Sequence, residues 1–290
     1  MLSGLAALFI YFPVQSQVKD LPSGPEPTAF LSFSFSPDSK QILYAKVDDA
    51  KNFDPQKRNI WVAKADGSGA HVVASGVGAA EWANNANTIM YLRNMPNGND
   101  LCIFDLKSKK ETSVGLKLPL RSAHCCPTTG KLVFMADVSK DAIQSFTCNL
   151  DGSDVRQVTF GPGKAYNPIW SPDGKRIAFF RELGDGKDQV YVMNQNGSNL
   201  RRISNPAEHN FYPDFGANGT VSFTIQKSES DKTIVICNDR GRVMRQFPFR
   251  TSRLRWSPDG KTAIFAAGEF PTMALYVSDA DGSNPKRIGN

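Results

Sequence analysis

Three histidines, at positions 71, 124 and 209, are the residues of this chain best suited to metal chemistry. We expect His124 and His209 in two loops that each lead into a strand, whereas His71 follows an Asp-Gly turn and should be exposed. Two imidazoles and one carboxylate, from Glu81 or Asp214, would supply three ligands for a divalent ion. Such a site would suit a metal-assisted polysaccharide lyase or hydrolase. The alternative is that the histidine rings are solvated or locally hydrogen-bonded and that the protein has no metal or other cofactor. The small number of histidines favours this alternative.

Arginines offer a second chemistry, the binding of acidic groups. The stretch "DRGRVMRQFPFRTSRLRW" holds six arginines between positions 240 and 255. Arg253 and Arg255 alternate with Leu and Trp, so in a strand both would lie on one face, away from the apolar side chains. There they would bind carboxylates of a protein partner or an acidic glycan, or else pair with the Glu81 and Asp214 carboxylates across a channel. Arginine serves both roles, and the sequence leaves the two open.

Several other classes of chemistry lack their sequence patterns. G-x-S-x-G, the nucleophile motif of α/β-hydrolases, is absent. Five cysteines include no C-x-x-C pair, and we expect buried free thiols rather than a zinc or redox site. The net charge is +6 with both signs interspersed, and Phe247 and Phe249 alternate with Pro as packing residues do, so nucleic-acid binding is not indicated.

The sequence contains an internal repeat, and the fold of that repeat must position these histidines and arginines. Copies such as "IWSPDGKRIAFF" and "RWSPDGKTAIFAA" share a large side chain, a turn and an apolar run, and degenerate copies lie between them at spacings of 41 to 47 residues. The repeated anchor residues are Phe35, Trp82, Cys126, Trp170, Phe215 and Trp256.

A second feature recurs in phase with the first. Each unit carries an alternating apolar strand that runs into a tight turn, four of which have Asp-Gly or Asn-Gly at the centre. Because such pairs accept positive φ at both central positions, they predict type I′ hairpins. The four pairs are Asp66-Gly67, Asp151-Gly152, Asn196-Gly197 and Asp281-Gly282.

Four strands per unit of this length, repeated six times, predict an all-β chain folded as a six-bladed β-propeller of four-stranded antiparallel blades. Each anchor would fill the interface between two blades. The predicted domain is 17–290, with blades at about 29–76, 77–117, 118–162, 163–206, 207–249 and 250–290. Residues 18–21 and 285–290 both resemble an outer strand, and either could complete the last blade.

In a propeller, the connections from outer to inner strands meet around one mouth of the central channel. Loops on a rigid scaffold, rich in Tyr and Arg, are typical of binding sites. The predicted partner-binding residues are Arg121, His124, Tyr166, Asn167, His209, Asn210, Tyr212, Arg250, Arg253 and Arg255.

The first sixteen residues, "MLSGLAALFIYFPVQS", contain an apolar run too short to cross a bilayer but of the length of a secretory signal core. We therefore expect a signal peptide at 1–16 and a periplasmic or secreted, monomeric protein with no integral membrane segment in its mature chain. The n-region carries no Lys or Arg, so a buried N-terminal segment is the alternative.

The unit W-S-P-D-G-K-x-I-A-F, followed by I/V-Y-V-x-x-x-D/N-G-S, resembles the propeller repeats of the TolB family, strongest at residues 31–75, 165–205 and 250–290. The resemblance implies a non-catalytic exported propeller that binds proteins in cell-envelope organisation or transport, as in the Tol-Pal system, with an envelope lipoprotein among the candidate partners. TolB carries an α/β domain ahead of its propeller, and here only residues 1–28 precede the first repeat. The same repeat also builds the propellers of prolyl oligopeptidase-like peptidases, so it is more specific for fold than for function.

Overall fold

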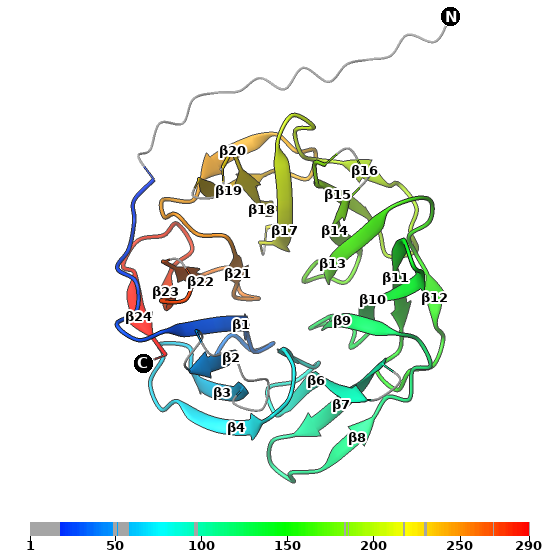
Figure 1. Cartoon of the computed structure of the whole chain (residues 1–290), viewed down its shortest axis with the longest axis horizontal. Coiled ribbons are helices and arrows are strands. Elements are labelled where there is room, and N and C mark those ends of the chain that lie inside the picture. The colour runs from blue at the N-terminus through cyan, green and yellow to red at the C-terminus, as the bar shows by residue number, and fades with distance from the viewer. Residues whose placement is uncertain are drawn as a thin grey trace, which may run out of the picture.

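The chain forms a ring of antiparallel β-sheets around a central axis (Figure 1). The computed structural model describes residues 18–48, 51, 58–95, 98–182, 184, 186–216, 218–228, 231–268 and 270–289. The expected signal peptide lies outside these residues. The strands are β1 (Thr28–Phe35), β2 (Gln41–Asp48), β3 (Arg58–Lys64), β4 (His71–Ser75), β5 (Ala80–Trp82), β6 (Thr88–Met95), β7 (Gly98–Asp105), β8 (Glu111–Ser113), β9 (Leu120–Cys125), β10 (Leu132–Ser139), β11 (Ala142–Cys148), β12 (Arg156–Gln157), β13 (Lys164–Trp170), β14 (Arg176–Glu182), β15 (Gln189–Asn194), β16 (Arg201–Arg202), β17 (His209–Phe215), β18 (Val221–Gln226), β19 (Lys232–Cys237), β20 (Val243–Gln246), β21 (Leu254–Trp256), β22 (Thr262–Ala267), β23 (Ala274–Asp279) and β24 (Lys286–Ile288).

The sheets follow the chain in order. β1–β4, β5–β8, β17–β20 and β21–β24 each form a four-stranded sheet, and β9–β16 form one eight-stranded sheet. Within that larger sheet, the link between β11 and β13 is a single parallel bridge from Ile143 to Lys164, whereas the other pairings are antiparallel ladders. The prediction of an all-β chain built from four-stranded antiparallel sheets is confirmed, and no α-helix occurs in the described residues.

Strand order gives the ring two distinct faces. In each four-stranded sheet the first strand is innermost, and the chain then runs outward by hairpins (Figure 1). The inner strands therefore all begin at the same side of the ring, which we name the start face, and end at the other, the end face. Second-to-third hairpins and outer-to-inner connections lie on the start face, and the remaining hairpins lie on the end face.

Short side chains close the first turn of each repeat on the end face. Ser171 Oγ donates to Asp173 Oδ1 at 2.6 Å, Ser171 N–H donates to the Arg176 carbonyl oxygen at 2.9 Å, and Arg176 N–H donates to Ser171 Oγ at 3.0 Å. The same Ser-to-Asp bond is found at Ser36 and at Ser257, at 2.6 and 2.7 Å. The Ser-Pro-Asp motif thus folds identically in three repeats because its hydrogen bonds are local.

The second hairpins differ from the predicted type I′ turn. Gly67 N–H donates to Lys64 O at 2.8 Å, and Gly67 has a φ of 83°, but Asp66 is not among the residues with positive φ. This is a type I turn followed by a glycine bulge, in which only the glycine needs a left-handed conformation. The Asp side chain instead accepts the N–H and hydroxyl hydrogen bonds of Ser68, at 2.9 and 2.7 Å. The hairpin prediction was right in position and wrong in turn type, with the same geometry at Gly152, Gly197 and Gly282.

Hydrophobic clusters join each sheet to the next. Trp82 packs with Leu43 and Ile60 of the preceding sheet, and Phe215 packs with Ile169 and Ala178. Cys126 and Trp170 share a further cluster. The anchors therefore fill interfaces between sheets, as the repeat predicts, because a sheet face only four strands wide must be buried against its neighbour.

The ring closes where the first sheet meets the last. Phe35 and Ile42 pack against Ile264 and Leu275. β24 pairs with β23 and is the outer strand of the last sheet. Lys19 lies beside Phe249 in a parallel bridge, so the described N-terminal segment crosses the boundary between the sheet β17–β20 and the sheet β21–β24. In the described residues, no helix has the length and apolarity needed to span a membrane.

Candidate binding site in the central channel

Two cavities lie in the channel enclosed by the inner strands. The start-face cavity, about 310 Å³, is lined by residues that precede the anchors, among them Ser122, Asn167, Tyr212 and Arg253, and by apolar residues of second and third strands such as Met90, Leu101 and Met135. The end-face cavity, about 70 Å³, is lined by the anchors and the prolines that follow them. Glu81, His124 and Arg255 line both. The channel is therefore divided at its middle by polar side chains.

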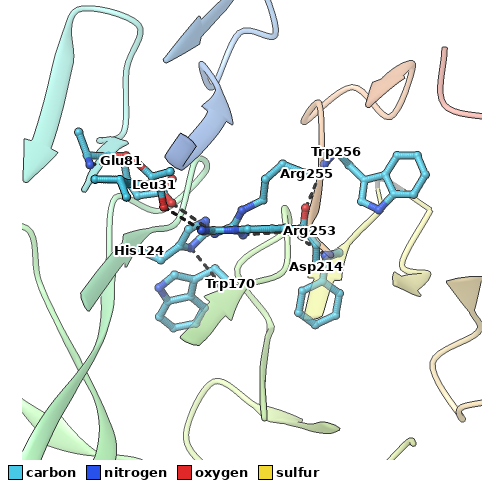
Figure 2. Close-up of polar contacts among 11 residues, drawn as sticks. Leu31, Glu81, His124, Trp170, Asp214, Arg253, Arg255 and Trp256 are labelled. Atoms are coloured by element: carbon cyan, nitrogen blue, oxygen red, sulfur yellow. Dashed lines mark hydrogen bonds and ion pairs between the residues drawn. The ribbon is translucent and has the colours of Figure 1, made fainter. Parts of the chain in front are cut away.

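An ion cluster forms that division. Arg255 Nη2 lies 3.2 Å from Glu81 Oε1, and Arg255 Nη1 lies 3.4 Å from Asp214 Oδ1 (Figure 2). The three side chains are only 11, 14 and 12% exposed. Asp214 also accepts the backbone N–H groups of Phe215 and Trp256, at 3.0 and 2.9 Å. The cluster links β21, β5 and β17, so one of the alternatives for Arg255, pairing across the channel, is confirmed.

Burial and the neighbouring charges act in opposite directions within the cluster. Burial raises the pKa of Asp214 above its usual value, although Arg255 and two backbone N–H groups oppose the rise. Burial alone would lower the pKa of Arg255, but the Glu81 and Asp214 carboxylates raise it above its usual value. Arg255 therefore stays positively charged, and the Glu81 and Asp214 carboxylates compensate that charge.

Arg253 lies beside this cluster in a different setting. Its Nη1 donates to the carbonyl oxygen of Leu31 at 3.2 Å (Figure 2). Its guanidinium carbon lies 5.5 Å from the Phe33 ring centroid and 5.8 Å from that of Tyr212. Within the described part of the chain it forms no ion pair. Burial, reinforced by the adjacent Arg255 charge, lowers the pKa of Arg253 to about 10, so it remains a cation at neutral pH.

His124 is held as a neutral ring. Its Nδ1 accepts the backbone N–H of Trp170 at 3.2 Å, which places the imidazole proton on Nε2 (Figure 2). Burial, together with the Arg255 and Arg253 charges, lowers the pKa of His124 to about 3. This histidine is a hydrogen-bond acceptor between two inner strands.

The structure separates the two histidines of the predicted metal site. His124 is the fifth residue of β9, near the end of an inner strand, whereas His209 is the first residue of β17. His209 Nδ1 lies 4.0 Å from a carboxylate oxygen of Asp188, and its side chain is 45% exposed. Among the described residues no group of three or more His, Cys, Asp or Glu side chains could hold a metal ion.

Of the other predicted site residues, some line the start-face cavity and others make contacts within the surrounding strands and loops. Arg121 lines the start-face cavity and is paired through Nε with both oxygens of Asp137, at 2.8 and 3.0 Å. Arg250 is paired with Asp20 and Asp231, at 3.0 and 2.9 Å.

Tyr166 and Asn210 make contacts that hold loops. The Tyr166 hydroxyl donates to Glu182 at 3.4 Å. Asn210 is fully buried, and its amide donates to the carbonyl oxygens of Asn205 and Glu208 at 2.9 and 2.6 Å. Asn210 therefore fixes the connection into β17.

Asn167 and Tyr212 share an unusual backbone. Their φ values are 47° and 51°, each precedes a proline, and each lies in a register shift of its inner strand. Asn tolerates positive φ, but the conformation is rare for Tyr, and strained positions of this kind cluster near functional sites. The signal was present in the sequence as "NPIW" and "YPDF", an X-Pro pair at the same distance before two successive anchors. The sequence prediction included Asn167 and Tyr212 but missed Phe33 and the Leu31 carbonyl, whose proximity to Arg253 depends on ring closure.

Fold and channel define the class: a β-propeller with a polar, divided central channel. A profile of the TolB beta propeller domain matches residues 42–290, and the chain belongs to that family.

Individual relatives match shorter parts. The Tol-Pal system protein TolB of Syntrophus aciditrophicus is 38% identical over 58 residues, which is 20% of this chain and 13% of that protein. A TolB homolog of Chlorobium luteolum is 28% identical over 141 residues, or 46% of this chain and 31% of that protein. The chain thus matches less than a third of the length of either relative.

Solved structures show the same fold at low identity. TolB from Acinetobacter baumannii superposes with a TM-score of 0.66 at 16% identity, over 93% of this chain and 65% of that chain. An oligogalacturonate lyase from Vibrio parahaemolyticus superposes with a TM-score of 0.61 at 17% identity, over 90% of this chain and 77% of that chain. Likeness at these identities extends to the fold alone.

Proposed function

We propose that the chain is an exported, non-catalytic six-bladed propeller that binds a protein partner through its start face. The observation that carries the proposal is the set of large apolar side chains exposed there. Phe160 and Phe270 are 65 and 64% exposed, and Met95 and Val138 are 49 and 47% exposed. They lie in, or next to, second-to-third hairpins and outer-to-inner connections. Exposed aromatic residues and Met are typical of protein interfaces.

The count of six blades follows from treating the sheet β9–β16 as two. Its halves, β9–β12 and β13–β16, each have the inner-to-outer order of the four-stranded sheets, and one bridge joins them. This division agrees with the six sequence repeats. The predicted blade boundaries remain part of the proposal, as does a domain that begins at residue 17.

A role like that of the Tol-Pal system is the specific form of the proposal. It is supported by family membership and by the relative named as a Tol-Pal system protein. The protein would act in the periplasm or outside the cell, as a monomer, with an envelope protein such as a lipoprotein as partner. An acidic glycan is the second candidate ligand.

A metal-assisted lyase or hydrolase is the enzymatic alternative, and the superposition on an oligogalacturonate lyase supports only its fold. The separation of His124 from His209 gives it no ligand set. Metal analysis of the purified protein tests this alternative, since a stoichiometric transition metal that is lost in the double variant His124→Ala, His209→Ala would overturn the proposal.

Site-specific photo-crosslinking tests the start face. A photoreactive amino acid at Phe160 or at Phe270 should give a discrete protein adduct in an envelope fraction, reduced by excess unlabelled protein. Leu200 is the matched control, because it is also exposed, at 46%, and precedes β16 on the end face. Equal adducts at Leu200, or none at either start-face position, would contradict the proposal.

A further inference from the structure

Arg253 and Arg255 stand two residues apart but differ in charge compensation. Arg255 is held between the Glu81 and Asp214 carboxylates. Arg253 has a backbone carbonyl and two aromatic rings as neighbours, and no ion pair within the described residues. An arginine has five N–H donors, so a single hydrogen bond leaves most of its capacity unused.

We propose that the start-face cavity is a carboxylate-binding site, in which the guanidinium of Arg253 takes the side chain of an Asp or Glu inserted by the protein partner. The site deepens the proposed function and rests on it. Arginine is suited to this task because its planar fork binds both oxygens of a carboxylate.

The cavity has the volume that such a group needs, and its mixed lining of apolar and polar side chains suits both the carbon atoms and the carboxylate of an acidic side chain. At about 310 Å³ it has room for roughly ten water molecules, and hence for an acidic side chain and part of its backbone. Ser122, Asn167 and Tyr212 line it with further polar groups. Glu81 also lines it, but that carboxylate is paired with Arg255 and does not compensate Arg253 through contact.

The walls beside Arg253 are rigidly built. Tyr212 packs edge-on against Phe180 and Phe211, with centroid distances of 5.8 and 5.0 Å. Its positive φ and the following proline fix the backbone, and Asn167 repeats that arrangement in the neighbouring inner strand. A bulge in a strand redirects a side chain, and strained residues persist where the surrounding structure holds them in place. The Tyr212 ring therefore forms one wall beside the guanidinium, 5.8 Å from its carbon atom.

Direct contact with the Arg253 guanidinium would also favour a bound carboxylate. Burial and the Arg255 charge lower the pKa of Arg253 to about 10, although the Glu81 and Asp214 carboxylates, which make no ion pair with it, oppose the fall. A bound carboxylate would stabilise the charged form, because an opposite charge within a few Å offsets both effects. The acidic side chain of a protein fits better than an acidic sugar, since the exposed Phe160 and Phe270 on the same face match a protein surface.

Arginine Nε–Hε resonances of the isotope-labelled protein test the site without a partner. Arg253→Lys identifies the Arg253 signal by its disappearance. Sodium propionate, which mimics the Glu side chain, should shift that signal saturably, with a dissociation constant on the order of 1 to 10 mM as expected for so small a ligand. Propionamide, and sodium chloride at equal ionic strength, should not. A response to propionate no larger than to chloride would overturn the proposal.

Arg121 provides the matched control. It lines the same cavity, but Asp137 already neutralises it. Arg121→Lys should keep the propionate shift of Arg253 within about threefold, whereas Arg253→Gln should weaken propionate binding, detected at other cavity resonances, at least tenfold. Equal losses of propionate affinity in the two variants would show that any positive charge in the cavity has the same effect, and would contradict a site at Arg253.

Two further outcomes are informative. Galacturonate that binds at least tenfold more tightly than propionate would overturn the assignment to a protein carboxylate in favour of an acidic sugar. Propionate binding without start-face crosslinks would contradict the proposed function while leaving the carboxylate site intact, so the two failures are distinguishable.

Discussion

Arg255 Nη2 donates to Glu81 Oε1 at 3.2 Å although the two residues are 174 positions apart in the chain. The bond runs from β21 to β5 across the channel, while Asp214 ties the same guanidinium to β17. Hydrophobic clusters join each sheet only to its neighbours, so this cluster is a contact of a different kind. It fixes the spacing of β21 and β5, whose sheets are not neighbours in the ring.

Replacement of Arg255 by Met should destabilise the ring strongly. Two buried carboxylates would lose their cation, and breaking a buried ion pair from one side costs about 3 to 5 kcal/mol in the free energy of unfolding. Chemical denaturation measures the loss. Arg121→Met is the control, because its pair with Asp137 is largely exposed and contributes at most about 1 kcal/mol. Similar losses in the two variants would show that the cluster is not a structural link.

The pH dependence of stability should report on His124. Its folded-state pKa of about 3 lies below the ordinary value of 6.5, so the neutral ring stabilises the fold above pH 6.5 and that contribution is lost as the pH falls from 6.5 toward 3. Between pH 7 and 4 the wild-type protein should lose about 2 to 3 kcal/mol more than His124→Asn, whose side-chain oxygen can accept the Trp170 N–H but cannot take up a proton. Parallel unfolding curves for the two proteins would contradict a buried neutral His124.

Gly197 should be far less replaceable than Gly69. Both have positive φ, 83° and 66°, but a Cβ on Gly197 would lie 2.7 Å from the Val158 carbonyl oxygen, whereas nothing lies within 4 Å of a Cβ on Gly69. Gly69→Ala should cost about 1 kcal/mol from backbone strain. Gly197→Ala should cost about 2 to 4 kcal/mol, because overpacking against the Val158 backbone is added. Thermal and urea unfolding compare them, and a larger loss at Gly69 would contradict this account of the hairpin.

The cysteines should be inert to alkylation in the folded protein. All five are buried and free, and burial raises the pKa of Cys102 to about 11 and the pKa of Cys125, Cys148 and Cys237 to about 12. Since the thiolate is the reactive species, iodoacetamide labelling at pH 8 should proceed only as fast as the protein opens. Rapid labelling of the native protein, measured by mass spectrometry, would contradict the buried setting.

Much of the fold was predictable because its determinants are local. The Ser-Pro-Asp turn closes through hydrogen bonds between residues at most five positions apart, so each copy folds in the same way wherever it lies. The Asp-Gly hairpins were located for the same reason. The turn type of these hairpins was not predicted. In the bulge geometry the Asp66 side chain accepts a hydrogen bond from Ser68, and an Asp-Gly pair in the sequence does not distinguish this turn from type I′.

The chain's sequence by itself determined the repeat, the strands and the presence of arginines near one mouth of the channel. Only the tertiary structure decided that Arg255 is paired with Glu81 and Asp214, that Arg253 forms no ion pair with the residues described, and that His124 and His209 occupy different ends of their inner strands. The reason is distance: alternation assigns a side chain to a face of its strand, but electrostatic partners more than a hundred residues away are set by how the sheets close into a ring.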